Sequence, residues 1–114
     1  MKYTGPVCRL CRREGEKLYL KGARCEGPKC PISKGRPAPG QHGLTSASAK
    51  KSEYAKQMRA KQKAKRIFTL TERVFSNYYQ KAENKEGVTG NELLKMLEKR
   101  FDNVIYRAGI ASSR

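Results

Sequence analysis

Cys8-Arg9-Leu10-Cys11 is followed, after 13 intervening residues, by a second close cysteine pair in Cys25-Glu26-Gly27-Pro28-Lys29-Cys30. Two such pairs separated by a loop can place four thiolates at the tetrahedral positions around one zinc ion. Gly27 and Pro28 help the second pair to turn back. The sequence therefore predicts one zinc site with four cysteine ligands, which are Cys8, Cys11, Cys25 and Cys30.

Other states of these thiols stay open at this point. Four cysteine ligands suit an iron-sulfur cluster equally well. Disulfides are typical of secreted proteins, but residues 1–10 lack the apolar core of a secretion signal. A redox-active pair would leave the other pair unexplained. We expect His42, the only histidine, to be a hydrogen-bonding loop residue, because the cysteines already complete a tetrahedral set.

The composition calls for a polyanionic partner. The 114 residues include 26 Lys and Arg against 10 Asp and Glu, which gives a net charge of +16 and an isoelectric point of about 10.1. Leu, Ile, Val and Phe are scarce, so part of the chain should need help to fold. No stretch approaches the roughly 18 apolar residues of a membrane span. We therefore expect a cytoplasmic protein with no membrane partner.

Charge and hydrophobicity divide the chain into two parts. Residues 1–47 are interpreted as a basic metal-binding arm that includes a Gly and Pro rich loop at residues 35–43, where regular structure is not expected. Residues 48–114 hold most of the large apolar residues and are interpreted as a helical RNA-binding region. The predicted fold class is mostly α, with a metal-stapled irregular N-terminal arm followed by a small helical domain.

Two helices are predicted at the start of the second part. Residues 48–66 are good helix formers, but their apolar stripe of Tyr54, Ala55 and Met58 is thin, so this helix needs an outside partner. Thr71, or Thr69 with Glu72, can cap the next helix. Its core-facing stripe comprises Phe75, Tyr78, Tyr79 and Ala82.

Further helices are predicted toward the end of the chain. Thr89 with Glu92 resembles a capping box, and Asp102 can cap a short helix that ends at a left-handed Gly109. Ile110 is expected to pack back onto that helix. Residues 111–114 look like the start of another helix, so the sequence reads as truncated. The stripes comprise Leu93, Leu94, Leu97 and Phe101 in the first of these helices and Val104 and Ile105 in the second.

The segment from residue 50 to residue 66 is strongly basic, and Glu53 is its single acid. Without acids one turn away, these charges repel one another unless an anion surrounds them. We therefore expect contacts with nucleic-acid phosphates, which position a protein without reading bases. Aromatic residues could stack on bases, but the helical spacing of Tyr54, Phe68, Tyr78, Tyr79 and Tyr106 favours core packing. The segment also contains Lys56 and Lys61, and its candidate phosphate contacts are Lys50, Lys51, Arg59, Lys63, Lys65 and Arg66.

Three segments together with the second cysteine pair resemble a known family over the whole chain. They are Gly5-Pro6-Val7-Cys8-Arg9-Leu10-Cys11-Arg12-Arg13-Glu14-Gly15, Pro39-Gly40-Gln41-His42-Gly43 and, most specifically, Leu97-Glu98-Lys99-Arg100-Phe101-Asp102-Asn103-Val104-Ile105-Tyr106-Arg107-Ala108-Gly109. The family is the bacterial fourth protein of the small ribosomal subunit, in its cysteine-bearing form.

The resemblance implies a structural protein with no enzymatic activity. Such a protein would bind 16S ribosomal RNA directly, help to nucleate assembly of the subunit body, contact neighbouring small-subunit proteins and help to line the path along which mRNA enters. It also implies that the four cysteines hold the metal. The residues it places at or near RNA, beyond those of the basic segment, are Arg12, Arg13, Arg36, Gln41, His42, Arg107 and Arg114.

The chain departs from this family in two places. Where the family usually has Tyr-Gly, the chain has Phe68-Thr69, and where it usually has Glu-Arg-Gln-Phe, the chain has Glu72-Arg73-Val74-Phe75. The family also continues past Arg114 into a further RNA-binding domain. We therefore expect this chain to be a fragment or a truncated copy. The rival hypotheses are a zinc-ribbon regulator of nucleic acids outside the ribosome and a thiol redox protein using Cys8 and Cys11.

Overall fold

The computed structural model of the chain describes residues 2–114, apart from the side chains of residues 46–48. Within that range the chain is helical and forms no strand, which confirms the predicted mostly α class. Its contacts define two compact units. We call Thr4–Ile67 the cysteine unit, and Phe68–Arg114 together with residues 2 and 3 the helical unit. The division between units falls after Ile67, whereas the predicted functional boundary at residue 47 stays a prediction.

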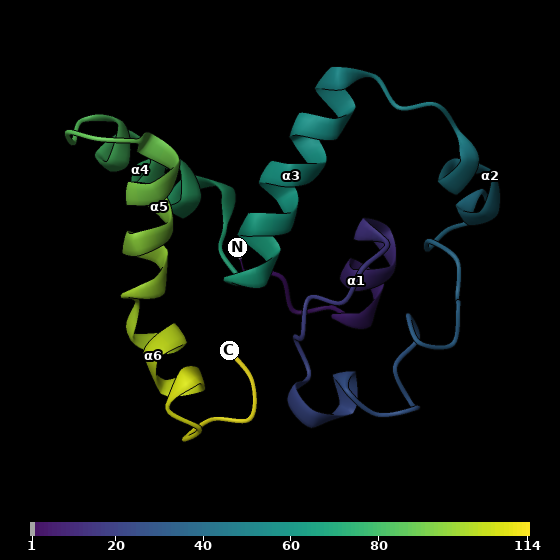
Figure 1. The fold of residues 1–114 in the computed structure, drawn as a ribbon. Helices are drawn as coiled ribbons and strands as arrows, with labels where there is room; N and C mark the ends of the chain where they lie inside the picture. Colours follow the sequence, from purple (N-terminus) through teal and green to yellow (C-terminus); the bar gives the residue numbers. More distant parts are fainter. Residues whose placement is uncertain (1) are drawn as a thin grey trace. The chain divides into compact units, whose positions relative to one another are not determined.

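The cysteine unit contains more helix than an irregular arm would. Its elements are α1 (Cys8–Glu14), the 3-10 helix η1 (Gly22–Cys25), α2 (Gly43–Ser48) and α3 (Glu53–Ile67) (Figure 1). Gly15 ends α1 in a left-handed conformation with φ of 77°, and its N–H donates to the Cys11 carbonyl at 2.9 Å. The expectation of an irregular arm was therefore wrong for α1 and η1, which are too short to produce a readable apolar period.

The core of the cysteine unit is very small. Cys11, Leu18 and Leu20 are its buried members, and partly buried residues from α1, from the loop before α2 and from the end of α3 pack against them. Two of the three buried residues follow α1 in the chain, and the third is a cysteine. Because this core is so small, apolar burial stabilises the 64-residue unit only weakly. Natural domains with such small cores often use a metal or another cross-link.

Helix α3 starts five residues later than predicted, at Glu53. The Ser52 hydroxyl accepts a hydrogen bond from the Ala55 N–H at 3.2 Å, which satisfies one of the free donors of the first turn. No residue of α3 is fully buried, as its thin apolar stripe implies. Its neighbour within the unit is α1, so the helix has the outside partner that the sequence required.

The helical unit is formed by α4 (Glu72–Glu83), α5 (Thr89–Glu98) and α6 (Phe101–Arg107), and α5 packs against both of the others. Thr71 caps α4 as predicted, because its hydroxyl oxygen accepts the Val74 N–H at 3.4 Å. The buried side chains on α4 and α5 are Phe75, Ala82 and Leu97. These three residues belong to the predicted stripes, which are confirmed in that part.

Several other expectations for the helical unit were wrong. The N-cap of α5 is Val88, without a side-chain hydrogen bond, so Thr89 does not form the predicted capping box. Phe101 is 79% exposed, because α5 ends at Glu98 and a new helix begins before the stripe can continue. Tyr79 also lies on the exposed side of α4.

Asp102 lies in the first turn of α6 instead of capping it, and Arg100 is the N-cap. The Asp102 carboxylate accepts two hydrogen bonds from the Arg100 guanidinium, at 3.1 and 2.8 Å. These bonds lower the pKa of Asp102 and raise that of Arg100. The guanidinium also lies over the ring of Tyr78, 5.7 Å from its centre, so this pair connects α6 to α4.

The last residues fold back without forming the predicted helix. Gly109 is left-handed as expected, with φ of 77°, but Ile110 is exposed and does not pack onto α6. The Arg114 guanidinium lies 4.5 Å from the ring centre of Tyr106 and 5.6 Å from that of Phe68. Its Nε donates to the side-chain oxygen of buried Asn103 at 2.8 Å. Arg114 therefore stabilises the helical unit.

Thr69 has a positive φ of 51°, in the left-handed region that β-branched residues rarely adopt. It stands where the resembled family usually has glycine. Thr69→Gly should stabilise the helical unit by about 1 kcal/mol, since relief of the left-handed strain outweighs the extra chain entropy of glycine. Hydrogen exchange at the α4 amides measures this change. Thr71→Gly is the contrasting variant, because φ at residue 71 is −79° and the substitution removes the cap bond to Val74 without relieving strain; stabilisation by both variants would contradict the prediction.

Candidate nucleic-acid interface and cysteine cluster

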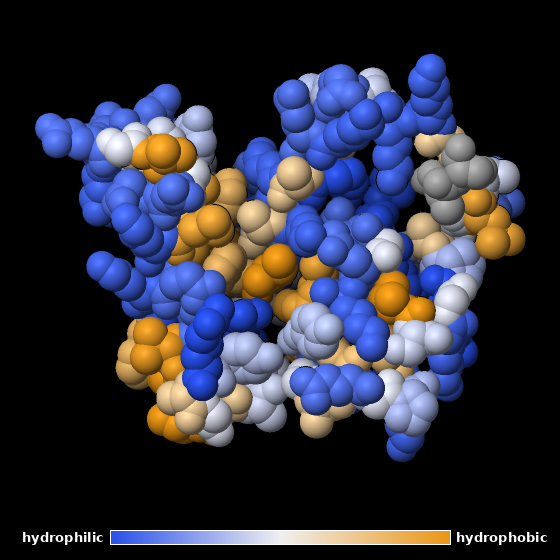
Figure 2. Space-filling view, in the orientation of Figure 1, coloured by the Kyte–Doolittle hydropathy of each residue, from blue (hydrophilic) through white to orange (hydrophobic). Residues whose placement is uncertain are grey.

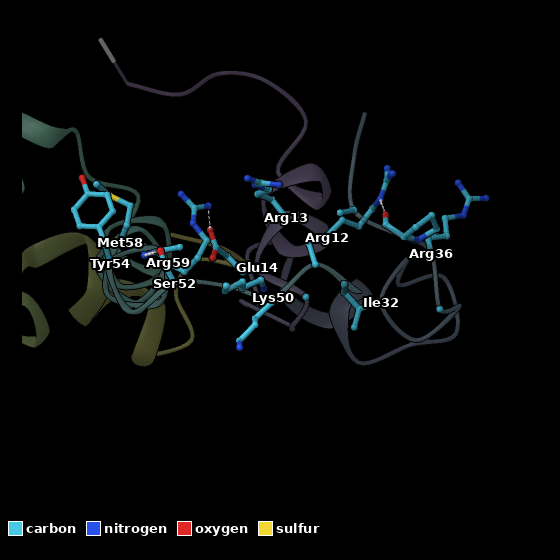
Figure 3. A pocket seen from close by; sticks show the side chains of 17 residues that line it. Arg12, Arg13, Glu14, Ile32, Arg36, Lys50, Ser52, Tyr54, Met58 and Arg59 are labelled. Carbon is cyan, nitrogen blue, oxygen red and sulfur yellow. Dashed lines mark hydrogen bonds and ion pairs between the residues drawn. The ribbon is translucent and has the colours of Figure 1, made fainter. Parts of the chain in front are cut away.

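A groove of about 820 Å³ in the cysteine unit brings four basic segments together (Figure 3). It lies between the end of α1, the loop before α2, the linker before α3 and the first half of α3. We call it the cationic groove. It is lined by Arg12, Arg13, Glu14, Gly15, Ile32, Gly35, Arg36, Pro37, Ala38, Ala49, Lys50, Lys51, Ser52, Tyr54, Ala55, Met58 and Arg59.

Six of the residues predicted to contact RNA line this groove. They come from positions up to 47 residues apart in the sequence, and all of them line the same groove. Glu14 is the single acid of the lining, and its charge is already opposed by arginines of α3. An anion entering the groove would therefore meet a strong positive potential. The six are Arg12, Arg13, Arg36, Lys50, Lys51 and Arg59.

Glu14 connects two walls of the groove, α1 and α3. Its side chain is only 3% exposed and accepts hydrogen bonds from Arg59, at 3.2 Å, and from Arg66. Nearby, Lys63 pairs with Glu16 at 2.8 Å. These bonds join the C-terminal end of α1 to α3, so the two walls of the groove have a fixed separation.

The α3 cations were expected to lack acids one turn away, but several of them have acidic partners elsewhere in the chain. Arg59, Lys63 and Arg66 are paired with acids 45 to 52 residues earlier in the chain, and Lys56 is paired with Glu53. Partners so distant in the sequence lie outside the i to i+4 spacing of neighbours on one helix. Figure 2 shows hydrophilic side chains covering much of α3 in that view, as expected for a helix with no buried residue.

The loop before α2 is held against the groove at two points. The Arg12 Nε donates to the Pro37 carbonyl at 2.7 Å. Gly43 is buried against Ala38, and a Cβ at residue 43 would overlap the Ala38 carbonyl oxygen and lie 2.9 Å from its carbon. Only glycine allows this close approach. Gln41 and His42 lie between these points with exposed side chains, outside the groove lining, and His42 is the N-cap of α2.

The four cysteines gather in one neighbourhood of the same unit, and all are free. Cys11, Cys25 and Cys30 are buried, and Cys8 is partly buried. Burial raises the pKa of the Cys11 thiol, and negative charge on the other three sulfurs raises that pKa further. Each of the other three thiols therefore lies within electrostatic range of Cys11.

Backbone N–H groups are directed at three of the sulfurs. The Lys21 N–H donates to Cys25 Sγ at 3.3 Å, and the Leu18 N–H donates to Cys11. Cys30 accepts from the N–H groups of Ser33 and Ile32, which lower its pKa. Hydrogen bonds of this kind orient thiolate ligands around a metal, so the donor set is compatible with a metal site.

The arrangement does not yet match metal coordination. Within residues 2–114, no group of three or more His, Cys, Asp or Glu side chains is placed so that it could hold a metal ion. The sulfurs would therefore have to move toward one another on binding, which is usual for small sites whose ligands are ordered by the metal itself.

The chain has relatives among known proteins. Residues 2–98 match the family described as "Ribosomal protein S4/S9 N-terminal domain". The chain belongs to this family. The S4/S9 N-terminal domain family is one of ribosomal proteins and not of enzymes. In the part of the chain that the structure describes, no helix is long and apolar enough to cross a membrane.

Individual relatives of this S4/S9 family member are close in sequence. It is 58% identical to "Small ribosomal subunit protein uS4" of Natranaerobius thermophilus and to "Small ribosomal subunit protein uS4A" of Symbiobacterium thermophilum, in each case over 99% of this chain and 54% of the relative. It is also 58% identical to the uS4 protein of Pelotomaculum thermopropionicum, over 99% of this chain and 53% of that protein. The chain thus spans about half the length of these relatives.

The remaining predicted RNA contacts of this family member lie outside the groove. Lys63, Lys65 and Arg66 are on α3 but do not line it. Arg107 and Arg114 belong to the helical unit, where Arg107 pairs with Glu98 at 3.1 Å. The structure therefore brings together the predicted contacts of the arm, the linker and the start of α3.

Sequence reasoning missed three contributors to the groove. Tyr54 is 71% exposed and lines it, so the expectation of core packing was wrong for this residue and right for buried Phe68. Ile32 and Met58 supply apolar surface to the lining. The exposure of Tyr54 could have been predicted, because it lies on a strongly basic helix whose apolar stripe is too thin to be buried.

Proposed function

We propose that the chain is a structural constituent of the small ribosomal subunit in the cytoplasm, which binds 16S ribosomal RNA directly and helps to nucleate assembly of the subunit body. The observation that carries this proposal is the cationic groove, where six basic side chains from separate segments converge. The names of the relatives, which are small-subunit proteins, support it. Contacts with neighbouring ribosomal proteins and with mRNA along the path by which it enters belong to the same proposal.

The groove suits RNA phosphates better than it suits base edges. Arginine and lysine side chains dominate its polar lining, and such contacts fix the position of a protein on RNA without reading sequence. Ion pairs within the unit join its walls and set their separation before RNA arrives. Selectivity for small-subunit RNA would then come from the RNA shape that presents phosphates to a concave surface.

One zinc ion held by Cys8, Cys11, Cys25 and Cys30 is part of this proposal. When bound, zinc would supply four thiolate bonds that cross-link α1, η1 and the segment after η1. The burial of three sulfurs and the N–H groups directed at them support it. An iron-sulfur cluster is the alternative occupant. The positive charges of Arg9, Arg12 and Arg13 would offset the negative charge of a metal tetrathiolate.

Binding to 16S ribosomal RNA should exceed binding to transfer RNA at physiological salt. If the five groove cations other than Arg12, whose Nε is bound to the Pro37 carbonyl, each neutralise one phosphate, the logarithm of affinity should fall against the logarithm of salt concentration with a slope of about −3.5 to −4.5. Filter binding over a salt series measures both quantities. Equal affinity for the two RNAs would contradict the proposed function.

A pair of double variants tests whether the groove carries this binding. Lys50→Gln with Lys51→Gln should reduce the magnitude of the salt slope by about 1.5, because two phosphate contacts are lost. Lys81→Gln with Lys85→Gln is the matched control, since it removes the same charge from the helical unit. Equal changes in slope for both pairs would place the binding surface outside the groove.

A further inference from the structure

We propose that Arg12 is a positioning residue of the cationic groove and not one of its phosphate ligands. This inference rests on the proposed RNA binding and concerns how the groove is assembled. The resemblance to the ribosomal family implies that Arg12 and Arg13 both lie at RNA, but the structure gives the two side chains different surroundings.

Arg12 anchors a loop that has few ways to be anchored. Its Nε donates to the Pro37 carbonyl at 2.7 Å, which is short for an N–H···O bond and typical of a charged donor. Pro37 and Pro39 have no N–H, so their backbones can be anchored only through their carbonyl oxygens, which accept hydrogen bonds. Figure 3 shows the Arg12 side chain extended toward this loop, next to Arg36.

The anchored carbonyl directly follows Arg36, which lines the groove. The Arg36 N–H donates to the Pro31 carbonyl at 3.0 Å, and the close approach of Gly43 to Ala38 holds the loop on its other side. Arg12 is thus the connection between this loop and α1. Without it, Arg36 and the wall formed by Pro37 and Ala38 would lose their fixed place opposite α3.

Arg13 provides the contrast. It follows Arg12 in α1, lines the same groove and is exposed, whereas Arg12 is half-buried. In the part of the chain described by the structure, its side chain makes no hydrogen bond or ion pair. Arg13 is free to bind a phosphate directly, so the same substitutions at the two positions should have opposite outcomes.

Glutamine and lysine separate the two roles at Arg12. The glutamine Nε2 stands as many bonds from Cα as the arginine Nε does, so Arg12→Gln keeps an N–H donor for the Pro37 carbonyl and loses the charge. Arg12→Lys keeps the charge and places a carbon at that position. If Arg12 is a positioning residue, Arg12→Gln should therefore retain more RNA affinity than Arg12→Lys.

The experiment is a salt series of 16S ribosomal RNA binding with four variants of the full chain, Arg12→Gln, Arg12→Lys, Arg13→Gln and Arg13→Lys. Arg12→Lys should weaken binding about 3- to 10-fold, the factor for one hydrogen bond, and Arg12→Gln should bind more tightly than Arg12→Lys with the wild-type salt slope. At Arg13 the order should reverse, and Arg13→Gln should reduce the magnitude of the slope by about 0.7 to 0.9.

Hydrogen exchange without RNA gives an independent result. Exchange at the Arg36 amide should become faster in Arg12→Lys and stay unchanged in Arg12→Gln and in both Arg13 variants. If Arg12→Lys binds like the wild type, or if Arg12→Gln loses a phosphate contact from its salt slope, Arg12 is a phosphate ligand and the inference is overturned. If the wild-type chain shows no preference for 16S RNA, the proposed function fails, while the exchange result still decides whether Arg12 positions the loop.

Discussion

Cys25→Ser should remove most hydrogen-exchange protection from the cysteine unit and leave the helical unit protected. Apart from three of its cysteines, the described part of the cysteine unit has only Leu18 and Leu20 as buried apolar residues. A structural zinc site contributes about 10 kcal/mol or more to folding, which so small a core cannot replace. The helical unit has its own buried residues, including Phe75 and Leu97, and none of the four cysteines. Exchange measured residue by residue on the full chain reports both units at once.

Controls separate loss of the metal from loss of a side chain. The wild-type chain in chelator should resemble Cys25→Ser, and chelator should not change the variant further. Ser33→Ala removes one hydrogen bond to Cys30 but no ligand, so it should still bind one metal. Native mass spectrometry should give the wild-type chain plus one zinc, and an iron-sulfur increment would identify the alternative occupant. Equal protection with and without chelator would refute a structural metal.

Glu14→Gln should destabilise the contact between α1 and α3 by about 2 kcal/mol. The Glu14 carboxylate is almost fully buried and accepts hydrogen bonds from both Arg59 and Arg66, whose side chains are 29% and 20% exposed. A neutral amide of the same shape leaves two partly buried guanidinium groups without a counter-charge, and loss of one partner of a buried pair is costly. The opening free energy from hydrogen exchange at the α3 amides measures the effect.

Glu16→Gln is the matched control for this prediction. Glu16 lies two residues later and pairs with Lys63 on the same helix, but both side chains are far more exposed than Glu14, at 48% and 41% against 3%. Exposed pairs contribute about 0.5 kcal/mol, because water screens them. Similar effects of the two substitutions would show that burial of Glu14 does not strengthen its ion pairs.

The parts of the fold that depend on local sequence were predictable. Apolar residues at helical spacing predict α4 and α5, and Thr71 is correctly identified as a cap because the cap bond spans only three residues. The left-handed Gly109 is likewise a local property of glycine. The predicted arrangement of the four cysteines around one metal stays a prediction.

Long-range pairing was not predictable by the same means. Nothing near Arg59 or Arg66 in the sequence indicates that Glu14 neutralises both. Val88 is the N-cap of α5 although threonine follows it, so the local preference for a hydroxyl cap does not decide where this helix begins. The basic segment that contributes Lys50, Lys51 and Arg59 to the groove was predictable. The concave shape was not, because it depends on the Pro37 carbonyl, which accepts a hydrogen bond from Arg12, 25 residues earlier in the sequence.

The apolar surface of the groove affects the kinetics of encounter. Ile32, Ala55 and Met58 form a weakly polarisable wall beside the cations, and such a wall concentrates electric field lines in the opening instead of letting water disperse them. A phosphate diffusing past would be drawn toward the groove before any contact forms. The same walls that give the site its shape would therefore also guide RNA to it, and the two properties would be lost together if the walls separated.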